Sequence, residues 1–362
     1  MGGVENVIDQ LAFGSVRLGL QVDVLSLSPQ HSTEPVTLNG YQVHSSHLDF
    51  QIASTGFSAS VFRDFSRLAR QADLIHYHFP WPFMDLVHFA SRLSKPTVVT
   101  YHSDIIRQKH LLRLYRPLMK SFLGDVGRIV ATSPNYLATS ADLTAFKDKV
   151  SVIPSGIEKA RYPTPSADSV GAWRRRFGHP FFAFVGVLRY YKGLDILLEA
   201  ARGLGCPVAI AGAGPIEQEL KLKAAELKLD NVHFLGFLSE EDKASLLLAS
   251  YGVVFPSHLR AEAFGVSLLE GAMYGRPLIS SEIGTGTSFI NIANETGLVV
   301  PPSDPAALRN AMLWLLENPE RAAAMGRCAE ERYWAQFTGS KMAEAYRDLY
   351  REQIEAHRAR AH

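Results

Sequence analysis

Residues 181–194 read FFAFVGVLRYYKGL, an apolar run that ends at a glycine and leads through a short polar loop into the next helix. Comparable apolar runs recur at 208–211, 232–235, 252–255, 277–280 and 297–300. Amphipathic stretches separate them. Short buried strands alternating with helices are typical of βαβ units and of a parallel sheet. The second half of the chain therefore predicts a doubly wound α/β domain.

The first half repeats this alternation. Its predicted strands are 22–27, 74–79, 97–101, 128–132 and 150–153, with a helix over 57–70 after the first of them. A helix over 4–18 directly follows Met1-Gly2-Gly3, so the strand that normally feeds such a glycine turn is absent. That strand is central in doubly wound sheets, and we expect its absence to leave a gap in the hydrogen-bond ladder. The pattern is that of a truncated or mis-started chain.

The chain of 362 residues is too long for one hydrophobic core, and its two α/β halves meet where prolines and serines interrupt all periodicity. We predict a first domain over 1–165 and a second over 166–338. The closing helix, over 339–362, carries a long apolar stripe that has to be buried, and we expect it to cross back to the first domain.

Composition excludes several classes of protein. The chain has 37 Lys plus Arg against 36 Asp plus Glu, which excludes a protein that coats polyanions through its net charge. It has only two cysteines, and it lacks both a membrane-spanning apolar run and a signal peptide. We expect a cytoplasmic protein that is either free or bound at the inner face of the cell membrane.

Two carboxylates flank an aromatic-glycine turn at residues 262–270, which read EAFGVSLLE. Gly265 lets the backbone approach a ligand closely, and the helix that follows offers free N–H groups to a phosphate. Glu270 is placed to accept hydrogen bonds from ribose hydroxyls, and Glu262 is placed to face a sugar. The alternative is a pair of solvated charges beside a helix.

Cations and histidines follow other predicted strands. Arg189 and Lys192 lie on one short loop, where they would offset the charge of a departing diphosphate, unless the loop is simply solvated. His102 follows the strand at 97–101, at an edge where open α/β sheets bind ligands. It could hydrogen-bond a sugar hydroxyl or serve structure alone, and His76 and His78 precede a similar strand end.

Together these motifs resemble the family 4 retaining glycosyltransferases of the GT-B fold. The resemblance implies two Rossmann-like domains facing a central cleft, with the nucleotide sugar mainly on the second and the acceptor mainly on the first. It assigns Glu262 and Glu270 to the Glu-x7-Glu motif, Arg189 and Lys192 to the donor diphosphate, and His102 to the transferred sugar. It also implies retention of anomeric configuration and no metal or other cofactor. In many relatives the arginine directly follows the glycine, where this chain has Val187.

The resemblance extends to residues expected around the nucleotide sugar. These are Gly3, Phe237, Leu238, Phe264, Gly265, Val266, Ser267 and Glu270. Gly3 matches the family's first glycine loop, and Phe237 and Leu238 fall where relatives hold the base. We assign His102, Glu262, Lys192 and Arg189 to catalysis.

Residues 102–109 and 280–288 resemble those of bacterial mannosyltransferases that build surface polysaccharides. This implies GDP-mannose as donor and a glycan or polyprenyl-linked acceptor. A UDP-sugar donor, a nucleotide-sugar 2-epimerase and a noncatalytic nucleotide-sugar-binding protein remain alternatives.

The segment 107–120 has five basic residues, no acid and interleaved apolar residues. It is either a contact with an anionic membrane surface or an ordinary surface helix. We expect no binding to nucleic acid, because no stacking-aromatic motif accompanies these charges.

Overall fold

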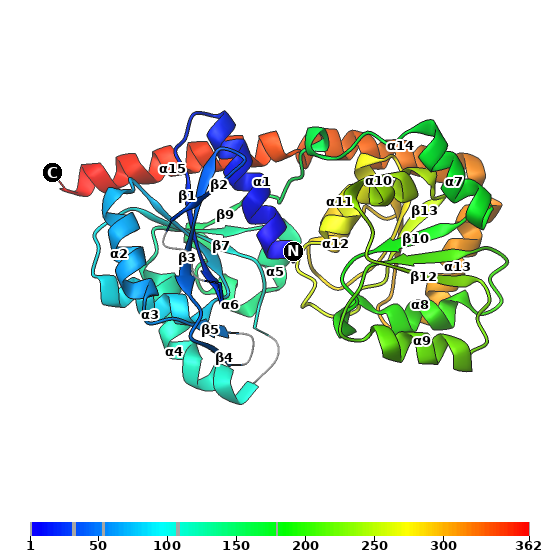
Figure 1. Ribbon diagram of the computed structural model, residues 1–362, viewed down its shortest axis with the longest axis horizontal. Coiled ribbons are helices and arrows are strands. Elements are labelled where there is room, and N and C mark those ends of the chain that lie inside the picture. Colours follow the sequence, from blue (N-terminus) through cyan, green and yellow to red (C-terminus); the bar gives the residue numbers. More distant parts are fainter. Residues whose placement is uncertain (1, 31–33, 53–54, 106–108, 179, 362) are drawn as a thin grey trace. The chain divides into compact units, whose positions relative to one another are not determined.

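The computed structural model describes residues 2–30, 34–52, 55–105, 109–178 and 180–361. It divides into two compact units (Figure 1). Unit 1 comprises Gly3–Pro154 together with Gly339–His362, and unit 2 comprises Ser155–Thr338.

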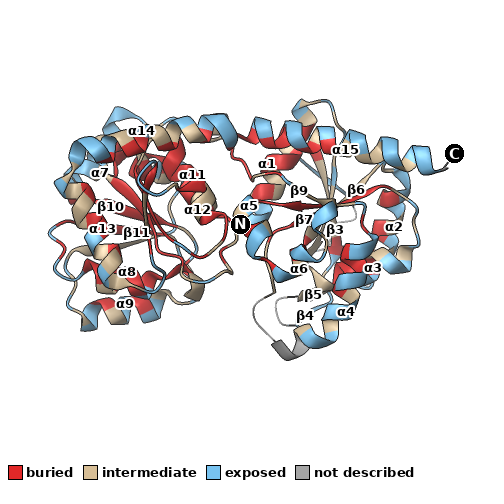
Figure 2. Ribbon diagram, turned by 180° about the vertical axis from the view of Figure 1, so that it is seen from behind, coloured by how far each residue is buried: buried red, intermediate tan, exposed pale blue. Residues whose placement is uncertain are grey.

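Unit 2 is built on a six-stranded parallel sheet in the order β12-β11-β10-β13-β14-β15. The strands are β10 (Phe182–Val185), β11 (Val208–Ala211), β12 (Val232–Gly236), β13 (Gly252–Phe255), β14 (Leu278–Ser281) and β15 (Gly297–Val300). Every residue of β10, β11, β13 and β14 is buried (Figure 2). Helices covering both faces of a sheet explain why these strands are apolar throughout. The predicted parallel sheet is confirmed.

Helices of unit 2 precede the first strand, connect successive strands and follow the last strand. They are α7 (Ala167–Phe177), α8 (Leu194–Ala201), α9 (Glu217–Glu226), α10 (Glu240–Ala249), α11 (Val266–Met273), α12 (Thr287–Ile290), α13 (Pro305–Glu317) and α14 (Pro319–Gln336). Short 3₁₀ turns occupy Lys159–Arg161 and Tyr190–Lys192. Side chains cap several of the helices: Ser166, Ser239 and Asp304 each accept a hydrogen bond from a backbone N–H three residues on.

In unit 1 the strands fall into three sheets. A four-stranded parallel sheet contains β6 (Ile75–Phe79), β7 (Thr97–Tyr101), β8 (Arg128–Ala131) and β9 (Val150–Val152), in that order. A second sheet has the order β1 (Asp23–Ser28), β3 (Tyr41–His47) and β2 (Val36–Leu38), with β2 antiparallel. Strands β4 (Phe50–Ile52) and β5 (Thr55–Phe57) form an antiparallel pair. Both β1 and β6 therefore lie at sheet edges.

The helices of unit 1 are α1 (Gly3–Arg17), α2 (Val61–Gln71), α3 (Pro82–Ser91), α4 (Lys109–Asp125), α5 (Pro134–Thr139), α6 (Ala141–Thr144) and α15 (Gly339–Ala361), with a 3₁₀ turn at Lys147–Lys149. Helix α15 packs along α1 (Figure 1). Gly14 permits this approach, because a Cβ there would lie 2.6 Å from Cβ of Ala343. The apolar stripe of α15, which includes Met342, Tyr346 and Leu349, is buried.

Two sequence-based boundaries differ from the structure. The helix expected over 57–70 begins at Val61, because Phe57 belongs to β5 and pairs with Phe50 across the hairpin. Residues 155–165, placed with the first domain from the sequence, belong to unit 2. Ile157 explains this, because it pairs with Thr338 and its carbonyl accepts the Tyr333 hydroxyl. The short strands β2 to β5 escaped prediction because three of the four have only three residues.

Candidate functional site

In unit 2 glycines let the loop after β11 pack closely against the loop after β10. A Cβ at Gly212 would lie 1.9 Å from the carbonyl oxygen of Gly186, and one at Gly214 would lie 2.3 Å from that of Leu188. Only glycine allows the two loops to pack backbone to backbone. This packing fixes the course of the segment that carries Arg189 and Lys192.

Lys192 and Glu262 meet in a buried ion pair. The Lys192 ammonium lies 2.5 Å from Oε2 of Glu262, and both residues are only 9% exposed. Ser257 donates a second hydrogen bond, 3.3 Å long, to the same oxygen. Burying two charges is costly unless they are paired, so the geometry ties the loop after β10 to the loop after β13.

Aromatic rings surround this ion pair. The Lys192 ammonium lies 4.6 Å from the centroid of Phe255 and 5.6 Å from that of Tyr191. Burial raises the pKa of Tyr191 to about 12, and the negative charge of Glu262 adds to the effect. Gly193, at φ +67°, lets the backbone turn here, where a Cβ would lie 2.1 Å from the Pro256 carbonyl oxygen. The ammonium thus lies in a rigid, largely desolvated setting.

His258 also lies beside this loop. Its backbone N–H donates to the Tyr191 carbonyl, and a Cβ on Gly193 would lie 3.2 Å from its Nδ1. In the described part of the chain, Nδ1 of His258 is buried without a hydrogen-bond partner. Leaving a buried polar atom without a hydrogen-bond partner costs free energy. Nδ1 of His258 is therefore a candidate to form a hydrogen bond with a ligand.

The turn before α11 brings a helix N-terminus to the same place. Gly265 has φ +101°, and α11 begins directly after it. Phe264 is buried against Gly286, where a Cβ would lie 2.5 Å from its ring. Oγ of Ser267 lies 3.8 Å from the position of a Cβ on Gly186. The first turn of α11 therefore faces the glycine loop after β10, and its free N–H groups suit a phosphate.

Glu270 is held separately. Its Oε1 accepts hydrogen bonds from Lys243, at 2.8 Å, and from the hydroxyl of Tyr162, at 3.1 Å. Burial and the neighbouring Glu270 carboxylate keep the pKa of Tyr162 well above its usual value. For Lys243, burial alone would lower the pKa, but Glu270 and Glu240 outweigh it and raise the pKa. Glu270 is thus a fixed carboxylate rather than a solvated one.

The remaining predicted residues of unit 2 lie near the surface. Arg189 is exposed and precedes the 3₁₀ turn that carries Lys192. Phe237 is 84% exposed, whereas Leu238 packs against the hydrophobic core. Val266 is partly buried against the same core.

In unit 1 a chain of hydrogen bonds and ring contacts leads away from His102. Nε2 of His102 lies 2.9 Å from Nδ1 of His78, and the two rings are stacked. The ring of His78 lies 4.4 Å from that of His76. His76 in turn bonds Thr100 and the hydroxyl of Tyr350, each at 2.7 Å.

Helix α15 supplies the outer end of this chain. The Tyr346 hydroxyl lies 2.6 Å from Oγ1 of Thr100, and Tyr350 comes from the next turn of the same helix. Burial lowers the pKa of His76 to about 3 and that of His102 to about 4, while burial and the two neighbouring histidines hold the pKa of His78 well below its usual value. All three imidazoles are therefore neutral at physiological pH, so His102 can hydrogen-bond without a fixed charge.

Gly3 begins α1, is exposed, and has open space where a Cβ would lie. Of the basic segment 107–120, residues 107 and 108 lie outside the described residues. The rest forms the first part of α4, where Leu114 is 81% exposed. Met119 is buried instead, and the hydroxyl of Tyr115 donates to Asp85 on α3. Tyr115 and Met119 therefore serve packing within unit 1.

Sequence reasoning missed several residues of these sites. They are Tyr162, Lys243, Ser257 and His258 in unit 2, and Tyr346 and Tyr350 in unit 1. Tyr162 lies in the proline-rich segment that the sequence indicates as a linker, and no sequence motif marks Lys243. His258 follows β13 by three residues, and this position at a strand end is a signal that could have identified it.

Two family models match the chain. "Glycosyltransferase Family 4" matches residues 1–161, and "Glycosyl transferases group 1" matches residues 171–332. A D-rhamnosyltransferase, WbpZ of Pseudomonas aeruginosa, is 59% identical over 338 residues, which cover 93% of this chain and 89% of that relative. O-antigen chain mannosyltransferase C of Escherichia coli is 48% identical over 355 residues, covering 98% of this chain and 95% of the relative.

The fold comparison agrees. The structure of sucrose-phosphate synthase from Thermosynechococcus elongatus superimposes with a TM-score of 0.82 at 22% identity, covering 98% of this chain and 94% of that one. The two Rossmann-like units thus form a GT-B fold. The chain belongs to the family 4, group 1 glycosyltransferases.

Proposed function

We propose that this glycosyltransferase moves a hexose of manno configuration from a nucleoside diphosphate to a growing surface glycan, with retention of anomeric configuration. The buried pair of Lys192 and Glu262 is the observation that carries the proposal. It holds an ammonium beside the glycine loop after β10 and the first turn of α11, where a diphosphate would find both fixed charge and free N–H groups.

In this mechanism Lys192 stabilises the charge that develops on the diphosphate as the sugar–phosphate bond breaks. The departing phosphate oxygen takes the proton of the acceptor hydroxyl on the same face of the sugar, so the carboxylates need not act as nucleophiles. Glu262 holds Lys192, and Glu270 holds the ribose through the carboxylate oxygen that Lys243 and Tyr162 leave available. His102 hydrogen-bonds a hydroxyl of the transferred sugar as a neutral imidazole.

Two relatives support a donor of manno configuration. One is a mannosyltransferase and the other a D-rhamnosyltransferase. D-rhamnose is 6-deoxymannose, so the two sugars differ only at C6. We propose GDP-mannose as the donor, with the GDP-activated 6-deoxy sugar as the second candidate because the relative with 59% identity carries that name.

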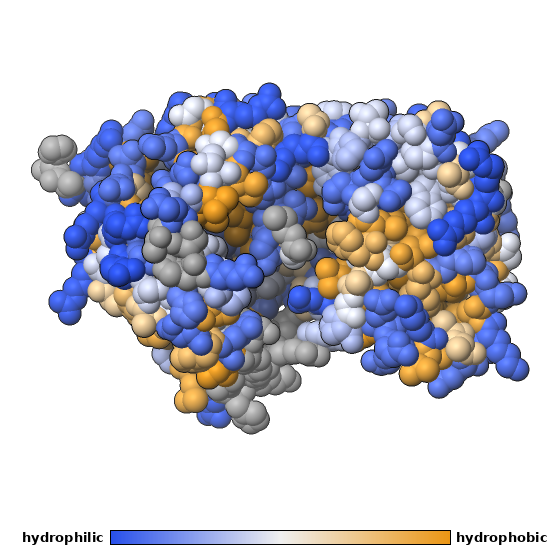
Figure 3. Space-filling model, viewed as in Figure 1, coloured by the Kyte–Doolittle hydropathy of each residue, from blue (hydrophilic) through white to orange (hydrophobic). Residues whose placement is uncertain are grey.

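The acceptor is proposed to be a glycan on a polyprenyl carrier. Exposed Arg113, Arg116 and Lys120 lie on α4 together with Leu114. Hydrophobic side chains gather near α3, α4, β4 and β5 (Figure 3). The exposed ones there are Phe50, Ile52, Leu86, Phe89 and Leu114. Basic and apolar groups side by side suit an anionic membrane surface. No helix among the described residues is apolar for long enough to cross a bilayer.

One assay tests the proposal. Purified protein is incubated with GDP-mannose, GDP-6-deoxymannose or UDP-glucose, with and without a polyprenyl-linked oligosaccharide, and the anomeric configuration of the product is read by NMR. We expect transfer from a GDP sugar only when acceptor is present, with the donor's anomeric configuration retained. Inversion, preference for UDP-glucose, or sugar interconversion without acceptor would each contradict the proposal, and the last result would favour an epimerase.

A further inference from the structure

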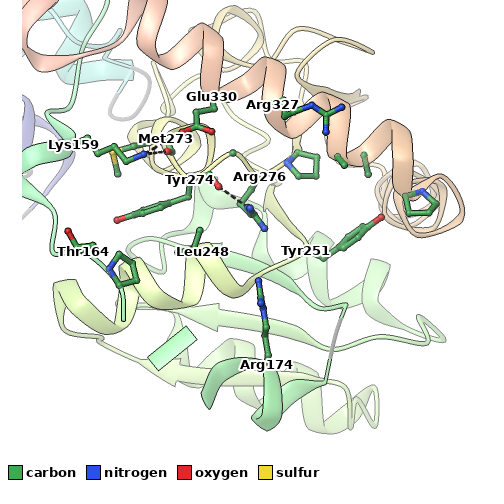
Figure 4. A pocket seen from close by; sticks show the side chains of 16 residues that line it. Lys159, Thr164, Arg174, Leu248, Tyr251, Met273, Tyr274, Arg276, Arg327 and Glu330 are labelled. Carbon is green, nitrogen blue, oxygen red and sulfur yellow. Dashed lines mark hydrogen bonds and ion pairs between the residues drawn. The ribbon is translucent and has the colours of Figure 1, made fainter. Parts of the chain in front are cut away.

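Unit 2 contains a cavity that is separate from the loops that carry Lys192 and Glu262. It has a volume of about 640 Å³ and lies beside the amino ends of two strands of the sheet (Figure 4). Tyr251 and Pro277, which line it, directly precede β13 and β14. The cavity therefore lies at the amino ends of strands whose carboxyl ends lead to the proposed donor site.

The lining of this cavity is strongly basic. It includes Lys159, Arg174, Arg276 and Arg327 but a single acid, Glu330. Glu330 pairs with Lys159, whose ammonium lies 3.4 Å from its Oε1. Within the described ranges, none of the three arginines has a hydrogen bond or ion pair to a carboxylate. Glu330 also offsets part of the charge of Arg276, whereas Arg174 and Arg327 have no carboxylate partner among the described residues.

Two of these guanidinium groups approach each other. Arg276 is anchored by hydrogen bonds to the carbonyl oxygens of Tyr274, at 2.9 Å, and Ser250, at 3.1 Å. Arg174 extends from α7 toward it (Figure 4). Burial lowers the pKa of Arg276, the positive charge of Arg174 lowers it further, and the carboxylate of Glu330 offsets part of this shift. An anion between them would replace repulsion with two charge-assisted contacts.

The start of α14 forms part of the same wall. A Cβ on Gly326 would lie 2.3 Å from the carbonyl oxygen of Gly275, so the helix packs directly on the turn before β14. Pro319, the first residue of α14, lines the cavity, and no side chain caps this helix. Its N-terminus adds partial positive charge. Much of the remaining lining is apolar and includes Leu248, Pro277, Ala322 and Ala323.

We propose that this cavity binds a small molecule that carries a phosphate group. Arg174 and Arg276 hold the phosphate, since the planar guanidinium fork matches phosphate oxygens, and Arg327 adds charge from α14. The apolar wall contacts the body of the ligand. The cavity volume lies within the range of small-molecule sites, and it exceeds what a bare phosphate ion fills.

Binding of inorganic phosphate and of phenyl phosphate to the full chain, measured by calorimetry, tests this site. We compare wild type with the double variant Arg174→Gln/Arg327→Gln, in which both altered residues are exposed. Arg175→Gln is the matched control, because it removes the same charge from α7 at an exposed residue outside the cavity lining. Lys192→Ala serves to remove phosphate binding at the proposed donor site.

We expect phenyl phosphate to bind more tightly than inorganic phosphate, and the double variant to weaken phenyl phosphate binding at least about tenfold. Arg175→Gln and Lys192→Ala should leave this binding within about twofold of wild type, because neither charge lies at the cavity. Absence of binding to wild type, equal loss in Arg175→Gln, or loss in Lys192→Ala with full binding by the double variant would each overturn the proposal.

Discussion

The polar side chains near the parallel strands are charged in unit 2 and neutral in unit 1. In unit 2 charges are held in pairs, Lys192 with Glu262 in the loops after β10 and β13, and Lys243 of α10 with Glu270 of α11. In unit 1 the strand ends hold histidines that burial keeps neutral, linked through His78 to His102. Charge that is fixed before the reaction suits a diphosphate leaving group, whereas neutral donors and acceptors suit sugar hydroxyls. The same α/β architecture thus supports two kinds of recognition.

The largest loss of activity is expected from substitution of Lys192, in the ion pair of unit 2. Lys192→Met should lower kcat/KM about 10²- to 10³-fold, because one fixed cation is removed from the developing phosphate charge. Steady-state transfer assays measure this, with Lys192→Arg as the variant that keeps the charge and Arg175→Gln as the surface control. Thermal unfolding checks that Glu262, left unpaired, has not unfolded the unit. A folded Lys192→Met enzyme that works within a few-fold of wild type would refute the role.

Substitutions of the neutral histidines in unit 1 should lower kcat/KM less. His102→Ala is expected to lower kcat/KM about 10²-fold, and His78→Phe about tenfold, since His78 acts by orienting the His102 ring. Because His102 stays neutral down to about pH 4, kcat should show no inflection near pH 6.5 from this residue. If His78 were merely structural, His78→Phe would lower the unfolding temperature and leave kcat unchanged.

The buried histidines also make unit 1 sensitive to acid. Burial lowers the pKa of His76 to about 3 and that of His102 to about 4 in the folded chain, from the usual value of 6.5. Below pH 6.5 the unfolded chain binds more protons, so stability falls as the pH falls. Each histidine should cost about 2 kcal/mol at pH 5. Hydrogen exchange of β6 and β7 between pH 7 and pH 5 measures the loss.

Variants separate this effect from an opposing one. Burial raises the pKa of Asp85 to about 7, so its protonation stabilises the folded chain as the pH falls from 7 toward 4. His76→Phe should therefore flatten the acid dependence, and Asp85→Asn should steepen it. His47→Gln, at an exposed histidine of the same unit, should leave it unchanged. An unchanged slope in His76→Phe would be the contrary result.

The smallest effect is expected at Arg189. Its side chain is exposed, so solvent screens its charge far more than that of buried Lys192. Arg189→Gln should lower kcat/KM about three-fold, mainly through a higher KM for the donor. Kinetics at two salt concentrations provide the measurement, and a loss as large as that of Lys192→Met would make Arg189 an equal partner in catalysis.

Much of the architecture could be predicted because it depends on local patterns. Apolar runs separated by amphipathic stretches determined the parallel strands of both units, and the strand at Thr97–Tyr101 has the predicted bounds. Glycines after strands indicated the loops of the candidate site, since a close backbone approach excludes a Cβ. The alternation missed the hairpin of β4 and β5, because each of its strands has only three residues.

The partners of the functional side chains came only from the tertiary structure. Lys192 and Glu262 are 70 positions apart, and Tyr346 reaches Thr100 across 246. The sequence alone marked Lys192, Glu262, Glu270 and His102 as candidates, but it gave no sign that His78 orients His102 or that Lys243 holds Glu270. Such contacts depend on where packing directs each side chain, and no local periodicity carries that information.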